Sequence, residues 1–308
     1  TDGEPITTFF EMAAEAGKSI GAVSSVQMTH ATPAAVYGHN ASRNNYDQLG
    51  KEGVYGSNPI ENNEWYDALN YYDNLKVLMG AGHPDYTNDN MLNPAVSDKY
   101  VGGTDTAVDV WDGTPPNGWT LVETKEDFEA VANGDLNPEK LLGIAQVNST
   151  LQQSRADLEG DFDTPNADVP TLETMTKTAL NVLDENPEGF AVMIEGGAVD
   201  WAGHANQLDR VIEEQMDFNN AVQAVVDYLE NNTNGNNWGN TLLIVTADHE
   251  TGHLWGDGTG SFFDVNGNGM FDVNQDYAHI TDKGSSNLPG AAFFSGSHTN
   301  ALVPLFAK

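Results

Sequence analysis

Short apolar runs alternate with helix-forming segments along most of this sequence, and this alternation limits the available folds more than any other feature. Residues 241–246 (TLLIVT) are apolar on both faces, which predicts a strand inside a parallel sheet. Strands that alternate with helices predict an α/β fold, with a mostly parallel sheet sandwiched between helices. The predicted strands are 19–25, 76–79, 189–194, 241–246 and 302–306, and the predicted helices are 7–16, 66–75, 171–186 and 207–231.

Two stretches interrupt this alternation. Residues 92–130 and 256–297 are rich in glycine and in polar turn-forming residues and lack clear periodicity, which predicts insertions or loop regions. The chain has 308 residues and no internal repeat, so we expect residues 1–308 to form a single α/β domain.

Acidic residues greatly outnumber basic ones: 46 Asp and Glu stand against 12 Lys and Arg, for a formal net charge of −34. A surface of this charge repels nucleic acid and anionic membranes, so neither is an expected partner. Because apolar periodic segments are present, the charge indicates a solvated acidic coat, as in halophilic proteins, and not disorder. No run in the sequence approaches the roughly 18 apolar residues that a membrane span requires.

The sequence contains no cysteine, which removes disulfides and thiolate metal sites. Any transition-metal site must therefore be built from His, Asp and Glu, and only 8 histidines are available. Residues of these types follow three of the predicted strands. Because ligands bind outside the carboxyl ends of strands in open α/β sheets, we expect these residues to meet in one crevice.

The first cluster follows the strand at 189–194. Glu195 comes directly after it and precedes two glycines, which let the backbone approach a ligand closely. Asp200 and His204 are four residues apart where a helix should begin, so they face the same way one turn apart. A carboxylate and an imidazole form a normal zinc ligand pair, although pairs on a helix surface have the same spacing.

The other clusters follow the fourth and first predicted strands. Asp248 and His249 stand at the tip of the fourth strand, where a buried charge needs a partner or a metal; a solvated loop is the alternative. Thr32 follows the first strand, and with Glu195 it offers hard oxygen ligands that suit magnesium better than zinc. His298, just before the last predicted strand, is a candidate for the remaining imidazole ligand.

Five motifs, taken in order, resemble those of alkaline phosphatases. They are His30-Ala31-Thr32-Pro33, Ser42-Arg43, Glu195 to Asp200 and His204, Thr246-Ala247-Asp248-His249, and Gly296-Ser297-His298-Thr299-Asn300. The spacing matches as well, and the likeness covers nearly the whole chain, most closely that of marine and halophilic bacterial members. The resemblance implies an alkaline phosphatase-like fold and the hydrolysis of phosphate monoesters.

The resemblance also implies two zinc ions and one magnesium ion. In the family, the first zinc activates the water that hydrolyses the phosphoenzyme, and the second zinc holds the nucleophile. The matching ligands are Asp200, His204 and His298 for the first zinc, Asp248 and His249 for the second, and Thr32 and Glu195 for magnesium.

Four further residues match positions around these metals. Arg43 corresponds to the arginine that binds two phosphate oxygens. A planar guanidinium suits such bidentate binding. His30 stands where family members carry aspartate or histidine, near magnesium and the phosphate. Trp201 matches a variable active-site position. His253 follows the second zinc pair closely and is either a supporting residue of the site or a solvated loop histidine.

The sequence departs from the family pattern at the nucleophile. The family uses a serine in an Asp-Ser-Ala-type motif upstream of the matched region, and no such motif occurs here. An upstream aspartate that bridges the second zinc and magnesium has no counterpart either. We therefore expect a domain incomplete at both ends, which binds zinc but alone hydrolyses phosphate esters poorly or not at all.

A turn-rich segment provides a candidate calcium site. Asp264, Asn266, Asn268 and Asp272 follow the spacing of a calcium loop with a glycine for the turn, but the twelfth position is Gln275 instead of a bidentate glutamate. An acidic surface loop is the alternative for this segment.

Two other functions remain open. One is another hydrolase of the same metal-dependent superfamily, such as a phosphodiesterase, although Arg43 with the Thr32 and Glu195 pair favours a monoesterase. The other is a non-catalytic, acidic, cation-binding module, which would bind metal without phosphate. The resemblance further implies phosphate monoesters and inorganic phosphate as ligands, a homodimer, and a periplasmic or secreted location, although the N-terminus shows no signal-peptide pattern.

Overall fold

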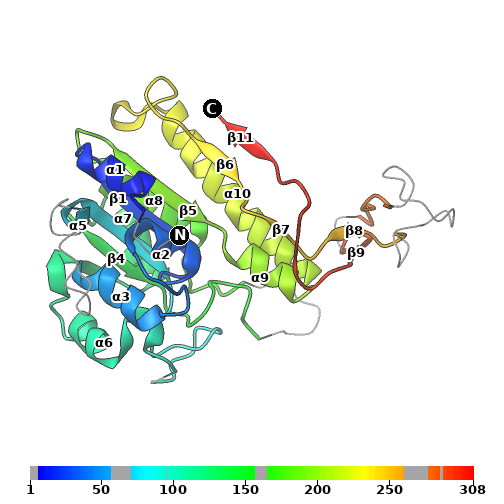
Figure 1. Cartoon of the computed structure of the whole chain (residues 1–308), viewed down its shortest axis with the longest axis horizontal. Coiled ribbons are helices and arrows are strands. Elements are labelled where there is room, and N and C mark those ends of the chain that lie inside the picture. The colour runs from blue at the N-terminus through cyan, green and yellow to red at the C-terminus, as the bar shows by residue number, and fades with distance from the viewer. Residues whose placement is uncertain (1–5, 57–70, 95, 157–164, 260–276, 285–286) are drawn as a thin grey trace.

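The computed structural model describes residues 6–56, 71–94, 96–156, 165–259, 277–284 and 287–308. Within these ranges, the main sheet contains β1 (Ser19–Gln27), β2 (Leu75–Ala81), β3 (Thr120–Val122), β4 (Leu141–Ile144) and β5 (Phe190–Glu195). The strands pair in the order β3-β4-β2-β1-β5, and every neighbouring pair is parallel (Figure 1). The predicted α/β fold with a mostly parallel sheet is therefore confirmed.

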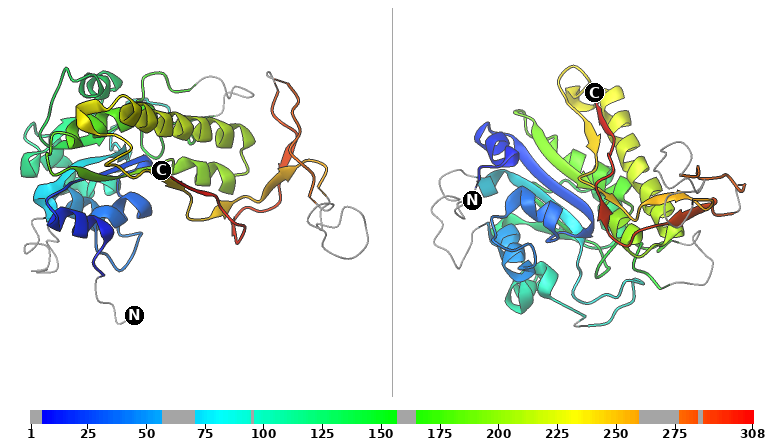
Figure 2. Two further views of the ribbon diagram at one scale, coloured as in Figure 1. Left: turned by 90° about the horizontal axis from the view of Figure 1, so that it is seen from above. Right: turned by 45° about the vertical axis from the view of Figure 1, so that its right-hand side comes forward.

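Helices cover both faces of this sheet, as Figures 1 and 2 show. On one face lie α7 (Lys125–Ala132), α8 (Leu172–Leu183) and α10 (Leu208–Glu230). On the other lie α1 (Phe9–Glu15) and α2 (Ala31–Tyr37). The remaining helices are α3 (Tyr46–Tyr55), α5 (Tyr71–Asn74), α6 (Gly103–Trp111) and α9 (Ala198–His204), with short 3-10 turns at Lys99–Val101, Pro116–Gly118 and Thr233–Gly235.

The central strand β1 organises the core because all nine of its residues are buried. Successive side chains of a strand point to opposite faces. Ile20 and Ala22 accordingly belong to the apolar cluster with α1 and α2, whereas Val23 belongs to the cluster with α7 and α8. Gly21 faces α8 so closely that an added Cβ would lie 2.8 Å from the Leu183 side chain, so a larger residue would require that side chain to move.

Most predicted elements lie within a few residues of their observed positions, but one predicted loop region is wrong. Residues 92–130 contain α6, β3 and α7, and both β3 and α7 belong to the layers of the main fold. Phe128 and Val131 are the large apolar residues of α7, and charged residues occupy half of its positions, so the helical period was weak. Of the helix predicted at 66–75, the described part is α5 alone.

The prediction that residues 241–246 lie inside the parallel sheet is also wrong. The observed strand, β6 (Ile244–Thr246), pairs antiparallel with β11 (Leu305–Ala307) and with no other strand of the described chain. The side chain of Ile244 is 55% exposed. The strand β5 is half-buried along its whole length, and it forms one edge of the main sheet within the described residues.

Two more antiparallel pairs complete the C-terminal part. β7 (Glu250–Thr251) pairs with β10 (His298–Thr299), and β8 (Leu254–Gly256) pairs with β9 (Ala291–Phe293). The β8–β9 pair projects away from the main body in Figures 1 and 2. Apart from β9 and Gly256 at the end of β8, the described parts of residues 256–297 contain no helix or named strand. Within the described residues, no helix is both long and apolar enough to cross a membrane.

The Phe128 side chain of α7 is fully buried between the sheet and α8, so it tests this packing. We expect Phe128→Ala to lower the free energy of unfolding by about 3–5 kcal/mol, because it removes buried apolar contacts and leaves a cavity. The matched control Phe306→Ala, at a side chain that is 65% exposed, should change it by less than about 0.5 kcal/mol. Denaturant unfolding measures both values, and equal losses would contradict the core described here.

Candidate active site

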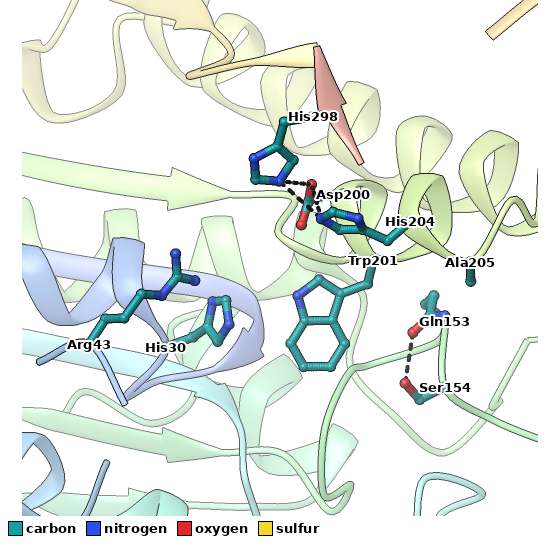
Figure 3. Close-up of a pocket in the computed structure, with 9 residues that line it drawn as sticks. All are labelled: His30, Arg43, Gln153, Ser154, Asp200, Trp201, His204, Ala205 and His298. Carbon is teal, nitrogen blue, oxygen red and sulfur yellow. Dashed lines mark hydrogen bonds and ion pairs between the residues drawn. The ribbon is translucent and has the colours of Figure 1, made fainter. Parts of the chain in front are cut away.

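A pocket of about 590 Å³ opens at the carboxyl ends of β1 and β5, where the sequence predicted a crevice. Its wall includes six residues that the sequence analysis singled out and that come from both halves of the chain (Figure 3). The lining residues are His30, Arg43, Gln153, Ser154, Asp200, Trp201, His204, Ala205 and His298.

The start of α9 sets the position of two of these side chains. Gly197 lies between β5 and the helix, and an added Cβ there would come within 2.9 Å of both the Glu195 and Val26 side chains, so a larger residue would require these side chains to move. The hydroxyl of Ser25 accepts a hydrogen bond of 3.1 Å from the backbone N–H of Ala198, the first residue of the helix. The helix then places Asp200 and His204 one turn apart on the face toward the pocket, as predicted.

Three ligand-type atoms converge at this point. The Nε2 atoms of His204 and His298 are 2.9 Å apart, and the Asp200 Oδ1 atom lies 3.5 Å and 3.3 Å from them, respectively. Zinc bonds of about 2.0–2.1 Å in a tetrahedron place ligand atoms about 3.3 Å apart. The observed spacings therefore fit the zinc site that the sequence predicted from these three residues.

The hydrogen bonding of His204 supports the same reading. Its Nδ1 atom lies 2.8 Å from the carbonyl oxygen of Gly296, a contact that requires a proton on Nδ1. The Nε2 atom of this tautomer carries a lone pair instead of a proton, and it faces the imidazole of His298. A carbonyl that fixes the tautomer and orientation of an imidazole is the usual support for a metal-ligating histidine.

A second set of residues adjoins the first. The imidazole of His249 stacks on that of His298 with ring centroids 3.5 Å apart, and Asp200, His249 and His298 offer atoms within 4.8 Å of one another. The Thr251 hydroxyl donates to Asp200 Oδ1 at 2.6 Å and lies 3.3 Å from His249 Nδ1. Asp248 Oδ2 lies 3.2 Å from His249 Nε2. The Asp248 side chain is exposed, because β6 lies outside the main sheet, whereas the sequence predicted that β6 would be buried inside it.

Glu195 occupies the end of β5 beneath these residues. Its carboxylate accepts a hydrogen bond from Ser24 of β1. Burial raises the pKa of Glu195, and the negative charges of Asp248 and Asp200 raise it further, whereas hydrogen bonds from Ser24 and Thr32 oppose the shift. Clustered carboxylates beside two hydroxyl groups make a suitable environment for a hard cation such as magnesium.

Arg43 and His30 lie together on the opposite side of the pocket from His204 (Figure 3). Burial and the charge of Arg43 lower the pKa of His30 to about 4, although Asp200 partly opposes the shift. His30 is therefore neutral at neutral and alkaline pH. The ring of Trp201 meets that of His30 edge to face at a centroid distance of 5.3 Å, which fixes both rings beside the Arg43 side chain.

Two sequence predictions fall elsewhere. His253 does not line the pocket; its ring lies next to those of Trp255 and Tyr277, at centroid distances of 6.0 Å and 5.7 Å, at the base of the β8–β9 pair. The candidate calcium ligands Asp264, Asn266, Asn268 and Asp272 lie outside the described residues.

The sequence analysis missed the neutral polar wall that Gln153 and Ser154 add to the pocket. These residues belong to an irregular loop between β4 and α8, where no periodicity or strand end marks them. Thr251 was also missed, although it stands two residues after His249 in a segment rich in candidate ligands.

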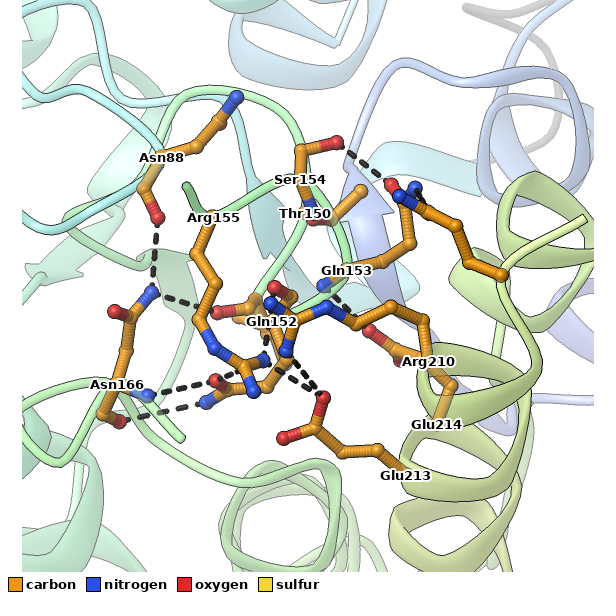
Figure 4. Close-up of polar contacts among 12 residues, drawn as sticks. Asn88, Thr150, Gln152, Gln153, Ser154, Arg155, Asn166, Arg210, Glu213 and Glu214 are labelled. Atoms are coloured by element: carbon orange, nitrogen blue, oxygen red, sulfur yellow. Dashed lines mark hydrogen bonds and ion pairs between the residues drawn. The ribbon is translucent and has the colours of Figure 1, made fainter. Parts of the chain in front are cut away.

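A buried polar network holds this wall in place (Figure 4). The backbone N–H of Gln153 donates to Glu214 of α10 at 2.8 Å, and the Gln153 side chain donates to Gln207 at 2.7 Å. Arg155 and Arg210 both donate to the same Glu213 oxygen, at 2.7 Å and 3.1 Å. The hydrogen bonds to Gln207 and Glu214 therefore fasten the loop to the segment and helix that follow His204.

The fold and this pocket define a class of protein: an α/β protein with convergent histidine and aspartate side chains on one wall of a pocket and an arginine on the opposite wall. The comparisons identify the family. The family model described as "Alkaline phosphatase" matches residues 1–279, and the chain therefore belongs to the alkaline phosphatase family.

Individual relatives agree with this assignment. Alkaline phosphatase 4 of Bacillus subtilis (strain 168) is 30% identical over 251 residues, which are 82% of this chain and 44% of that protein. The alkaline phosphatase of Gadus morhua is 27% identical over 320 residues, which are 97% of this chain and 60% of that protein. The chain thus spans about half the length of the curated relatives it matches.

Solved alkaline phosphatases share the fold. The cold-active enzyme from the psychrophile Shewanella sp. has a TM-score of 0.61 and 23% identity over 100% of this chain and 73% of that one. The enzyme from Thermus thermophilus has a TM-score of 0.63 and 19% identity over 98% and 68%. A variant of the enzyme from the Antarctic bacterium TAB5, with a TM-score of 0.61 and 20% identity over 100% and 70%, has magnesium bound in its M3 site.

The convergence of His204, His298 and Asp200 can be tested by zinc binding. We expect His204→Ala to weaken zinc binding by at least about 100-fold, because it removes one of three convergent ligand atoms. The control His279→Ala changes an exposed histidine that does not line the pocket and should leave the affinity unchanged. Competition with a chromophoric chelator measures both, and equal affinities would contradict a zinc site here.

The network of Figure 4 predicts a pH-dependent stability. Burial raises the pKa of Glu214 from 4.5 to about 8, helped by the charges of Asp217 and Glu213 and opposed by Gln153 and Arg155. Between these two values the folded chain keeps a proton that the unfolded chain has lost. The free energy of unfolding should therefore fall as the pH rises through this window, by up to about 1.4 kcal/mol per pH unit, and level off above pH 8.

The variant Glu214→Gln isolates this contribution, because its amide oxygen can still accept from Gln153 but does not titrate. Its free energy of unfolding should depend less on pH between 5 and 8 than that of the unmodified chain. Denaturant unfolding at several pH values measures the difference, and parallel curves for the two proteins would refute the raised pKa.

Proposed function

We propose that this chain provides the metal- and phosphate-binding apparatus for hydrolysis of phosphate monoesters. The observation that carries the proposal is the convergence of Asp200, His204 and His298 in a pocket that Arg43 also lines. Membership of the alkaline phosphatase family supports it. A metal cluster and an arginine on opposite walls of one pocket suit a ligand that carries several negative oxygens.

We propose two zinc ions and one magnesium ion as cofactors. Asp200, His204 and His298 would hold the first zinc, Asp248 and His249 would contribute to the second, and Thr32 and Glu195 would hold magnesium. When bound, these ions supply positive charge to the phosphoryl group as it is transferred. The tetrahedral spacing at His204, the fixed tautomer of that residue and the hydroxyl groups around Glu195 support these assignments.

Arg43 and His30 would have different tasks. The guanidinium of Arg43 can bind two phosphate oxygens at once through parallel N–H groups. His30 remains neutral beside it, because burial and Arg43 lower its pKa to about 4, so it can donate or accept a hydrogen bond without adding charge. The edge-to-face contact with Trp201 keeps its ring in this position.

Export and assembly are further proposals that rest on family membership. We propose a periplasmic or secreted homodimer, with an acidic coat suited to high salt. The net charge of −34 supports the acidic coat, since a highly charged surface stays hydrated and disfavours nonspecific association.

Phosphate binding tests the proposed function. In the presence of zinc and magnesium, inorganic phosphate should bind the chain, and Arg43→Ala should weaken its binding by about 10- to 100-fold through loss of a charge-assisted contact. Arg43→Lys keeps the charge but loses the fork of donors, so it should fall between the two. Isothermal titration measures the three affinities with and without chelator.

A second assay follows catalysis. Because the sequence contains no counterpart of the family's serine motif, hydrolysis of p-nitrophenyl phosphate by the chain at alkaline pH should be slow or absent. Any turnover that is observed should stop when a chelator removes the metals. Metal binding with no phosphate affinity in any of the three proteins would instead favour a non-catalytic cation-binding module. Turnover that survives chelation would contradict the assigned metal chemistry.

A further inference from the structure

The pocket is larger than a phosphate group needs. Its volume of about 590 Å³ falls in the range of pockets that bind whole small molecules. Arg43 lies on one side of it, and His204 lies on the opposite side (Figure 3). A phosphoryl group that contacts both sides leaves the rest of the pocket to the alcohol part of its ester.

The remaining wall of the pocket is polar but uncharged. Gln153 and Ser154 form it, and Ala205 and the indole of Trp201 line the pocket beside them (Figure 3). Among the described residues that line the pocket, Arg43 is the only arginine, and none is a lysine. A second anionic group on the ligand would therefore meet neither at this wall, and the net charge of −34 would disfavour it further.

The hydrogen bonds within this wall fix its polarity. The Gln153 side chain donates from Nε2 to Gln207 Oε1 at 2.7 Å, which orients the amide. The amide oxygen of Gln153 then accepts from the Ser154 hydroxyl, also at 2.7 Å. Because a hydroxyl has one proton and two lone pairs, Ser154 can accept a hydrogen bond from a ligand in the pocket but has no proton left to donate.

An acceptor of this kind selects a ligand that donates. Carboxylate and phosphate oxygens only accept, so they would leave the Ser154 oxygen unpaired, whereas an alcohol hydroxyl can donate to it. An ammonium group also donates, but a charge that leaves water for a neutral wall loses more hydration than one such contact returns. The wall therefore suits a neutral hydroxyl group best.

The wall is also fixed in place before any ligand binds. The backbone N–H of Ser154 donates to the Thr150 hydroxyl at 2.8 Å, and Gln153 is only 8% exposed. Gln207, which holds the Gln153 amide, stands three residues after His204 in the chain. One segment thus carries a candidate zinc ligand and supports this wall, and such preorganisation lowers the entropic cost of binding.

We propose that Ser154, oriented by Gln153, forms a subsite for the alcohol part of phosphate esters of polyhydroxy alcohols, such as polyols and sugars. A free hydroxyl of the alcohol donates to the Ser154 oxygen, and its carbon chain lies along the indole of Trp201. The phosphoryl group lies between Arg43 and His204. The subsite depends on the proposed function, because phosphate binding is what brings the alcohol to this wall.

Two matched ligands test the subsite. Glycerol 1-phosphate and propyl phosphate have the same carbon chain, but only the first carries free hydroxyl groups. In the presence of zinc and magnesium, the chain should bind glycerol 1-phosphate about 3- to 10-fold more tightly, which corresponds to one additional hydrogen bond. Isothermal titration measures both affinities, and phosphorus NMR checks that the esters stay intact.

A pair of serine variants provides the control. In Ser154→Ala the ratio of the two affinities should fall to about 1, because glycerol 1-phosphate loses its acceptor and propyl phosphate has no hydroxyl to lose. Ser149→Ala changes a serine of the same loop that does not line the pocket, and it should keep the ratio of the unmodified chain. Circular dichroism checks that both variants fold.

Two results would overturn the subsite while phosphate binding stands. They are equal affinities for the two esters in the unmodified chain, and a ratio that Ser154→Ala leaves unchanged. Tighter binding of 2-aminoethyl phosphate than of glycerol 1-phosphate would also overturn it and assign the wall to a cationic group. If inorganic phosphate and both esters fail to bind, the proposed function fails and the subsite with it, so the two failures are distinguishable.

Discussion

The parallel pairing of β1 with β5 is the interaction on which the rest of the site depends. Six consecutive residue pairs, from Ser19 with Phe190 to Ser24 with Glu195, hold the two strands in register. This register brings the Ser24 hydroxyl to Glu195 and the Ser25 hydroxyl to the first N–H of α9. A one-residue slip would separate both contacts and turn the apolar side chains of one strand to the wrong face.

A second, much smaller pairing brings in the last histidine. His298 lies opposite Thr251 in the two-residue ladder of β10 and β7, and Thr251 in turn donates to Asp200. The carbonyl of Gly296 orients His204 from the same segment. The cluster therefore depends on two strand pairings. One is the long pairing of β1 with β5 in the main sheet, and the other is the short, half-exposed pairing of β10 with β7 in the C-terminal part. The second is the weaker support, because fewer buried contacts hold it.

Residue patterns predicted the layers of the fold and much of the candidate site. Short apolar runs such as residues 19–25 predicted the strands. The i, i+4 spacing of Asp200 and His204 predicted that their side chains face the same way. The rule that ligands bind at strand ends predicted that these two residues and His298 would lie close together, as they do. Burial was not predictable for residues 241–246, because an apolar strand does not specify its partner. Gln153 and Ser154 also gave no signal, since a loop position acquires its place in a pocket only through tertiary contacts such as the bond to Glu214.

The three arginines of the chain are distributed very unequally. Arg155 and Arg210 are buried in the network of Figure 4, and Arg43 alone is exposed, on the wall of the pocket. A phosphate ester of the kind proposed as substrate would therefore meet long-range repulsion from a chain of net charge −34 and reach this guanidinium only at close range. Dissolved salt shortens the reach of that repulsion from about 10 Å at 0.1 M to about 3 Å at 1 M, whereas two charges in contact are no farther apart than the shorter distance. Added salt would thus weaken the repulsion that opposes the approach of an anion more than the attraction at contact with Arg43.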